Sequence, residues 1–174
     1  IANSYCIGDE HKKIISKYIE DFKKMDKNSG DYLVMHGNLR QYIELVKVDI
    51  IRDLIHDHME DGFSIAIFLN YTNSINKLAK YFNGQIISAD SRQIYKHMDL
   101  GTGKISKNEM QGIKHYMLDI ITPNKKFSAG QYKKEATSCI KKILKSKKIP
   151  FLVGGSAMYI YSIVKGWEFP ETKI

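Results

Sequence analysis

A run of polar side chains directly follows a short apolar segment in residues 86–95. Asp90 stands at the end of the apolar residues, and Ser91, Arg92 and Gln93 come next. A carboxylate in this setting can bind Mg²⁺ through water, accept a proton, or contact the edge of a nucleic-acid base. The alternative is structural: Asp90 caps a short helix that begins at Ser91. Both interpretations remain open at this point.

A second group with chemical potential is the sequence Gly154-Gly155-Ser156, which lies between an apolar run and a helical pattern. Glycines let the backbone approach a ligand closely, and a helix N-terminus attracts anions. The Ser156 hydroxyl would lie at the same anion-facing end. Taken alone, the motif is more typical of an ordinary strand–helix turn in which Ser156 is the N-cap.

Other short motifs do not define a site. Residues 101–104 read Gly-Thr-Gly-Lys, but Ile105 follows, and the phosphate-loop pattern G-x-x-x-x-G-K-[ST] does not occur in the chain. The six histidines lack metal-binding spacing. Cys6 and Cys139 are far apart and form neither a zinc motif nor a disulfide framework.

The hydrophobic pattern predicts a mainly helical segment in residues 1–60 and an α/β domain in residues 61–174. Within the second segment, strands are expected at 64–69, 85–89, 115–120 and 149–153, and helices at 73–82, 128–148 and 157–164. Ser128 and Gln131 have the spacing of a capping box. Alternating strands and helices favour a parallel sheet, in which ligands bind beyond the carboxyl ends of the strands. Asp90 and Gly154 both lie at such ends.

The composition indicates a folded, basic protein. The chain has 174 residues, 43% of them hydrophobic, and a formal net charge of +8. This charge favours polyanionic partners such as nucleic acid or phosphorylated ligands, although a lysine-rich solvated surface would give the same balance. No stretch reaches the ~18 apolar residues of a membrane helix, and no signal-type segment occurs at the N-terminus. We therefore expect a cytoplasmic protein without membrane contact; the oligomeric state is left open.

Four motifs together resemble the tRNA dimethylallyltransferases, also called tRNA isopentenyltransferases. They are "NGQIISADSRQIYKHMDLGTGK", "GIKHYMLDIITP", "FSAGQYKKEA" and "IPFLVGGSAMYI", and the match as a whole extends over about residues 83–170. The resemblance implies an α/β fold with a three-layer, P-loop-NTPase-like parallel sheet flanked by helices. It also implies transfer of a dimethylallyl group from dimethylallyl diphosphate to N6 of an adenosine beside the anticodon, with tRNA, through its anticodon stem-loop, as the partner.

The resemblance assigns the first polar group to the tRNA side of the reaction. Asp90 would accept a hydrogen bond and then the proton from the adenine N6 amine, which is a poor nucleophile. The residues that would hold the tRNA near the target base, together with Asp90, are Ser91, Arg92 and Gln93. The base must leave its stack to be reached.

The second group is assigned to the diphosphate side. Ser156 stands where the family usually has Thr, and its hydroxyl would bond the oxygen that bridges to the leaving diphosphate. Gly154, Gly155 and Lys104 would lie near the phosphates, and Mg²⁺ would neutralise them.

The chain departs from the family upstream of the matching region. The family's P-loop is absent, and residues 68–72 fill its place. Residues 38–82 resemble the start of the second RecA-like lobe of superfamily 2 helicases. The family's helical tRNA-gripping insertion and Arg-rich segment lie beyond the matching residues, so a poor catalyst is expected. The alternatives to a prenyltransferase are a non-catalytic nucleic-acid-binding α/β module and a helicase-lobe fragment.

Overall fold

The computed structural model describes residues 7–60 and 65–169 and contains two compact units. The first unit is Ile1–Leu78 and the second is Ala79–Ile174. The boundary expected after residue 60 coincides with the end of a long helix, whereas the contacts divide the chain between Leu78 and Ala79. No helix in the described ranges combines the length and apolarity needed to span a bilayer.

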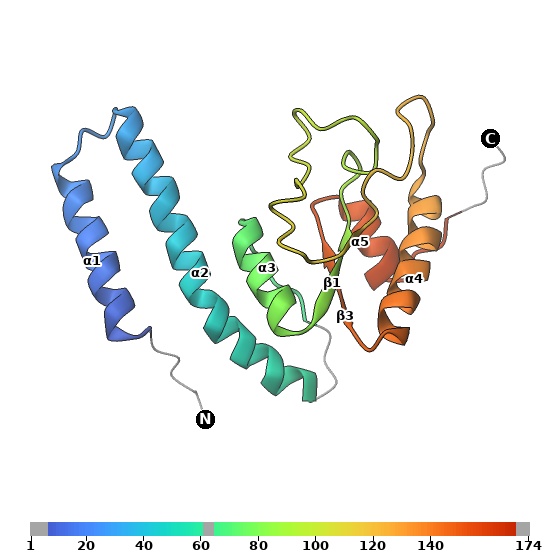
Figure 1. The fold of residues 1–174 in the computed structure, drawn as a ribbon, viewed down its shortest axis with the longest axis horizontal. Helices are drawn as coiled ribbons and strands as arrows, with labels where there is room; N and C mark the ends of the chain where they lie inside the picture. Colours follow the sequence, from blue (N-terminus) through green and yellow to red (C-terminus); the bar gives the residue numbers. More distant parts are fainter. Residues whose placement is uncertain (1–6, 61–64, 170–174) are drawn as a thin grey trace. The chain divides into compact units, whose positions relative to one another are not determined.

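The first unit is helical, as the sequence predicts. Helix α1 spans Asp9–Lys24, α2 spans Gly30–Glu60, and α3, which spans Thr72–Tyr81, begins in this unit (Figure 1). Aromatic contacts join α1 to α2: the rings of His11 and Tyr42 meet edge to face, and the His11 Nδ1 and Tyr42 hydroxyl lie 2.8 Å apart.

The prediction of a strand at 64–69 is wrong for residues 65–69, which the structure describes. Residues 65–69 have no regular secondary structure, and Phe68 is 95% exposed. The next backbone N–H groups, of Asn70 and Tyr71, donate to the Glu44 carboxylate at 2.9 and 3.0 Å. A strand requires a neighbouring strand for its backbone hydrogen bonds, and an apolar run of this length does not reveal whether one exists. The first residue of the run lies outside the described residues.

The second unit is built on a parallel sheet in the order β2-β1-β3. Strand β1 spans Gly84–Ser88, β2 spans His115–Tyr116, and β3 spans Ile149–Val153. Ile86 is paired with a residue of each neighbouring strand. The predicted α/β class with a parallel sheet is therefore confirmed.

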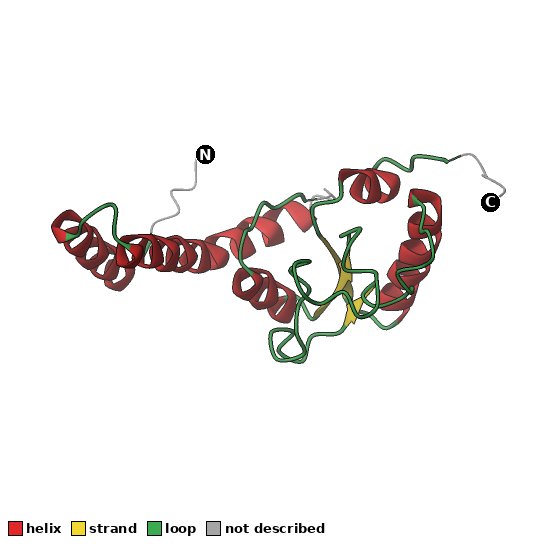
Figure 2. Cartoon of the chain, turned by 90° about the horizontal axis from the view of Figure 1, so that it is seen from above, coloured by secondary structure: helices red, strands yellow, loops and turns green. Residues whose placement is uncertain are grey.

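Two helices lie together on one side of this sheet (Figure 2). They are α4, Ala129–Lys145, and α5, Ala157–Val164. The predicted capping box begins α4: the Ser128 N–H donates to Gln131 Oε1 at 2.8 Å, and the Gln131 N–H donates to Ser128 Oγ at 3.2 Å. Residues of β1 and α4 with no exposed surface form the core between sheet and helix, namely Ile87, Tyr132, Ala136 and Ile143.

Strand β2 is shorter than the predicted strand at 115–120. It ends at Tyr116 because Met117 and Asp119 have φ angles of 64° and 53°, in the left-handed region that a strand excludes. Farther along, Ile121 forms an isolated parallel bridge with Tyr95.

Candidate active site

Asp90 and Ser156 lie beyond the carboxyl ends of two adjacent parallel strands. Ser88, the last residue of β1, is in register with Val153, the last residue of β3. The Ala89 N–H then donates to the Val153 carbonyl at 2.7 Å, so the pairing continues to the residue before Asp90. The structure thus brings together the two polar groups that the sequence places at strand ends.

Ser156 makes a hydrogen bond on each side of Asp90. Its backbone N–H donates to the Ala89 carbonyl at 3.0 Å, and its Oγ accepts from the Ser91 N–H at 2.8 Å. Ser156 precedes α5, but its side chain makes no capping bond to that helix. Ser156 is thus the N-cap residue by position, as expected, but its hydroxyl is not used to cap α5. A hydroxyl that accepts from an N–H retains its own proton, so Ser156 remains able to donate.

Asp90 uses one carboxylate oxygen to hold the turn that follows it. Asp90 Oδ1 accepts from the Arg92 N–H at 2.8 Å and from the Gln93 N–H at 3.2 Å. This is the geometry of a cap, although residues 91–94 form turns and not an α-helix. Asp90 Oδ2 forms no hydrogen bond with any residue in the described ranges, so it is available to a ligand.

The three residues after Asp90 differ in their exposure and contacts. The side chains of Ser91 and Arg92 are exposed, and Arg92 forms no ion pair with a described residue. Gln93 is half-buried and anchors a loop: its Nε2 donates to the Gly103 carbonyl at 3.0 Å, and its Oε1 accepts from Ser88 Oγ at 3.3 Å. Of these three residues, Arg92 therefore presents an exposed charged side chain.

Lys104 is enclosed by protein acceptors. Its Nζ donates to the Tyr95 carbonyl at 2.7 Å, to Asp99 at 2.8 Å and to Asp119 at 2.7 Å, and its side chain is 5% exposed. Burial alone would lower the Lys104 pKa, but the bonds to Asp119 and Asp99 outweigh it and raise the pKa above its usual value. An ammonium has three donors. Contact of Lys104 with diphosphate stays a prediction and requires one of these bonds to open.

The two glycines after β3 have different surroundings. A Cβ on Gly154 would overlap the backbone of Ala89, including its carbonyl carbon and oxygen. Gly154 is thus required by the close approach of two backbone segments. A Cβ on Gly155 would meet nothing within 4 Å, and Gly155 is exposed. Of the pair, Gly155 has space for a ligand beside it.

A buried pair of tyrosines contacts the end of β1 just before Asp90, and sequence reasoning gave this pair no role in the site. Tyr132 stacks on Tyr159 with ring centroids 3.9 Å apart, and the Tyr132 hydroxyl donates to the Ser88 carbonyl at 3.0 Å. Burial, with smaller contributions from Tyr95 and the Asp90 charge, raises the pKa of Tyr159 to about 12. The signal that could have indicated this contact was a Tyr on the apolar face of a predicted helix. A buried Tyr hydroxyl usually has a hydrogen-bond partner.

The described residues contain no group of three or more His, Cys, Asp or Glu side chains placed to hold a metal ion. The carboxylate at the strand ends is that of Asp90. The two other carboxylates near this loop, of Asp99 and Asp119, are bonded to Lys104.

Comparisons with known proteins find relatives for the second half of the chain. Residues 93–174 match the family model for IPP transferase. The tRNA dimethylallyltransferase of Thermoanaerobacter sp. (strain X514) is 56% identical over 94 residues, which cover 54% of this chain and 30% of that protein. The chain therefore spans about 30% of the length of this relative.

Solved structures agree. The tRNA delta(2)-isopentenylpyrophosphate transferase of Staphylococcus epidermidis is similar with a TM-score of 0.52 and 46% identity, over 55% of this chain and 32% of that one. The full-length tRNA isopentenylpyrophosphate transferase of Bacillus halodurans is similar with a TM-score of 0.56 and 38% identity. The similarity covers 57% of this chain and 33% of that one. The resemblance seen in the motifs is confirmed: residues 93–174 match the IPP transferase family model, and about half of the chain is similar to tRNA dimethylallyltransferases.

Proposed function

We propose that this chain acts in tRNA modification and transfers a dimethylallyl group from dimethylallyl diphosphate to N6 of an adenosine next to the anticodon. The observation that carries the proposal is the placement of Ser156, which bonds Ala89 and Ser91 on either side of Asp90. This placement puts a free carboxylate oxygen and a free hydroxyl proton at one edge of the sheet. A carboxylate and a hydroxyl donor are the two groups that the transfer requires.

Asp90 is the proposed base. The exocyclic amine of adenine is a weak nucleophile, so loss of its proton must accompany attack on the allylic carbon. Asp90 Oδ2 accepts that proton, while Oδ1 stays bonded to the N–H groups of Arg92 and Gln93. The base reaches Asp90 only after it leaves its stack. The exposed Arg92 is the proposed contact to the RNA beside it.

Ser156 is the proposed donor to the leaving group. The nitrogen–carbon bond forms as the allylic carbon–oxygen bond breaks, and the electron pair of the broken bond goes to the diphosphate oxygen. A donor aimed at that oxygen stabilises the developing negative charge. The bond from the Ser91 N–H holds Ser156 Oγ in place and leaves the hydroxyl proton for this oxygen. Gly155, with open space beside it, is proposed to lie near the phosphates.

Mg²⁺ is proposed as the cofactor, held mainly by the substrate. Mg²⁺ keeps several waters in most sites and binds through one or two carboxylates together with phosphates. The described residues offer Asp90 and no three-ligand cluster, which fits an ion carried by the diphosphate. Bound there, it would neutralise the charge of the leaving group.

A second candidate function is RNA binding without catalysis. The sequence contains no phosphate-loop pattern, so it lacks the usual cradle for a diphosphate. The basic net charge of +8 would support RNA binding in either case.

The two functions are separated by one experiment. The full chain is incubated with an unmodified anticodon stem-loop RNA, dimethylallyl diphosphate and Mg²⁺, and the RNA is digested and examined by mass spectrometry. An N6-dimethylallyl adenosine supports the transferase. RNA binding with no product at high protein concentration contradicts it and supports the binding module.

A further inference from the structure

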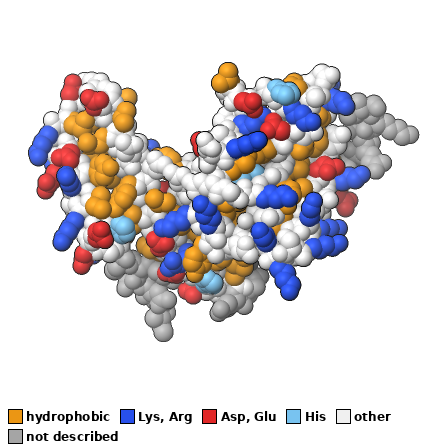
Figure 3. Space-filling view, in the orientation of Figure 1, with side chains coloured by type: hydrophobic (Ala, Val, Ile, Leu, Met, Phe, Trp, Pro, Cys, Tyr) orange, Lys and Arg blue, Asp and Glu red, His pale blue; other side chains and the backbone are white. Residues whose placement is uncertain are grey.

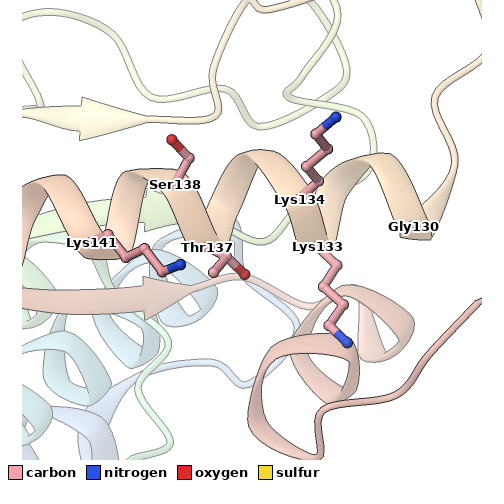
Figure 4. A pocket seen from close by; sticks show the side chains of 6 residues that line it. All are labelled: Gly130, Lys133, Lys134, Thr137, Ser138 and Lys141. Carbon is pink, nitrogen blue, oxygen red and sulfur yellow. The ribbon is translucent and has the colours of Figure 1, made fainter.

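The exposed side of α4 carries a concentration of lysines. We define the lysine face as the exposed side chains of Lys134, Lys141 and Lys145. Figure 4 shows Lys134 and Lys141 beside a surface hollow of ≈ 480 Å³, together with the hydroxyl side chains Thr137 and Ser138. In Figure 3, Lys and Arg side chains gather over α4 and the neighbouring loops.

The lysine face lies on the outer side of the helix. The inner side is marked by Tyr132, Ala136 and Ile143, which have no exposed surface. At about 100° per residue, Lys134 and Lys141 lie roughly opposite Tyr132 around the helix axis. These lysines are therefore not needed for packing against the sheet.

The charge of this face is not neutralised. Glu135 is the one acidic residue in the α4 sequence. Across the described ranges, no lysine of α4 forms an ion pair with a carboxylate. The adjacent Lys133 is occupied differently: its Nζ donates to the carbonyls of Gly166 and Trp167, both at 3.0 Å. Three exposed ammonium groups thus remain for an anionic partner.

The first turn of α4 is fixed to the end of β1 by a buried contact. The Tyr132 hydroxyl bonds the Ser88 carbonyl at 3.0 Å, which fixes this turn of α4 against the end of β1. Asp90 lies just beyond that strand end, and Lys134 follows Tyr132 on the helix. Lys134 follows on the outer side of the same turn of α4, so the lysine face starts at the end of the helix that is fixed to the end of β1.

We propose that the lysine face binds the phosphate backbone of the RNA whose adenosine enters the Asp90 site. At a rise of 1.5 Å per residue, Lys134 and Lys145 are about 16 Å apart along the axis. A nucleic-acid strand carries one charge per roughly 3.4 Å, so the face spans several successive phosphates. Thr137 and Ser138 add hydroxyl donors within the same hollow. This inference rests on the proposed function, because it assumes an RNA partner.

Such contacts have a distinct signature. Phosphate contacts carry no base information, so they strengthen binding to many RNA sequences equally. Each contact releases counterions, and the logarithm of the binding constant falls by about 0.7 per phosphate for each tenfold rise in salt on a single strand.

The test is a salt titration of RNA binding by the full chain without a prenyl donor. The probe is an unmodified anticodon stem-loop RNA, and binding is followed by fluorescence anisotropy. The test variant is Lys134→Gln/Lys141→Gln/Lys145→Gln. The matched control removes three exposed lysines of α1 instead, as Lys13→Gln/Lys17→Gln/Lys24→Gln. Circular dichroism establishes that both variants stay folded.

The test variant is expected to bind at least roughly tenfold more weakly at low salt, with a salt slope shallower by about 2. The control should retain the wild-type slope. Equal slopes for the wild type and the test variant, or an equal loss in the control, would overturn the proposal. Because no product is measured, the binding test is independent of catalysis. If the lysine-face variant loses RNA binding selectively but the wild type forms no prenylated RNA, only the transferase proposal is contradicted.

Discussion

The backbone N–H of Ser91 donates a 2.8 Å hydrogen bond to Ser156 Oγ, and this bond joins the turns that follow β1 and β3. Asp90 lies immediately before the donor. A residue distant in sequence therefore fixes the backbone on which the proposed base is carried. The same bond orients the Ser156 hydroxyl, so one contact positions both proposed catalytic groups.

Ser156→Ala is expected to lower the rate of prenyl transfer by about 10²–10³ because a donor to the leaving oxygen is lost. It also removes the acceptor for the Ser91 N–H, which costs about 1 kcal/mol of stability. Ser156→Thr keeps the hydroxyl and should retain activity within roughly tenfold. The measurement is single-turnover product formation at saturating RNA. Equal losses in the two variants would show that the hydroxyl is not the feature that matters.

Gly154→Ala is expected to destabilise the protein by about 1–3 kcal/mol, since the new Cβ would overlap the Ala89 backbone. The neighbouring Gly155→Ala serves as the matched control. Its Cβ meets nothing within 4 Å, so its effect should stay within about 0.5 kcal/mol. Urea unfolding followed by circular dichroism measures both. Similar midpoints for the two variants would contradict the close approach of Gly154 to Ala89.

The sequence was sufficient to predict elements with local signals. The capping box at Ser128 and Gln131 marks the start of α4, and the predicted helix at 157–164 is α5 as observed. Parallel strands with polar residues at their carboxyl ends were enough to place Asp90 and Gly154 at one edge of the sheet.

Contacts between distant segments were not predictable in this way. The apolar run at 64–69 reads as a strand because its pattern does not show whether a partner strand exists, and Phe68 is 95% exposed. Likewise, the three acceptors of Lys104 come from separate loop positions, and Lys104 was assigned to phosphate by resemblance alone. Pairing of this kind depends on tertiary structure.

Lys104→Met tests how much the bonds from Lys104 to Asp99 and Asp119 stabilise the fold. We expect a loss of about 1 kcal/mol at neutral pH, a modest value because Asp99 and Asp119 are largely exposed. The folded-state pKa of Lys104 is raised, so its stabilisation is complete below the unfolded value of about 10.4 and is lost as pH rises through the folded value.

The gap in Tm between wild type and Lys104→Met should therefore be constant to about pH 10 and narrow above it. Thermal unfolding across this range measures the gap, with Lys96→Met, at an exposed position, as the control that should show none. A difference in Tm that widens with rising pH would contradict a raised pKa of Lys104 in the folded state.

Removal of metal should separate activity from folding. Chelation by EDTA is expected to abolish prenyl transfer and to leave Tm unchanged, because no cluster of metal ligands occurs in the described part of the chain. Activity should return with added Mg²⁺. A lower Tm after chelation would reveal a structural metal site and contradict an ion held mainly by the diphosphate.

The most direct test compares wild type with Asp90→Asn in the formation of N6-dimethylallyl adenosine in an anticodon stem-loop RNA. Asn keeps an oxygen for the N–H groups of Arg92 and Gln93 but cannot accept the N6 proton. Wild type should yield product, and Asp90→Asn should be slower by about 10²–10⁴. Asp31→Asn, an exposed position on α2, is the control and should match wild type. Equal rates for wild type and Asp90→Asn would contradict the assignment of Asp90 as the base.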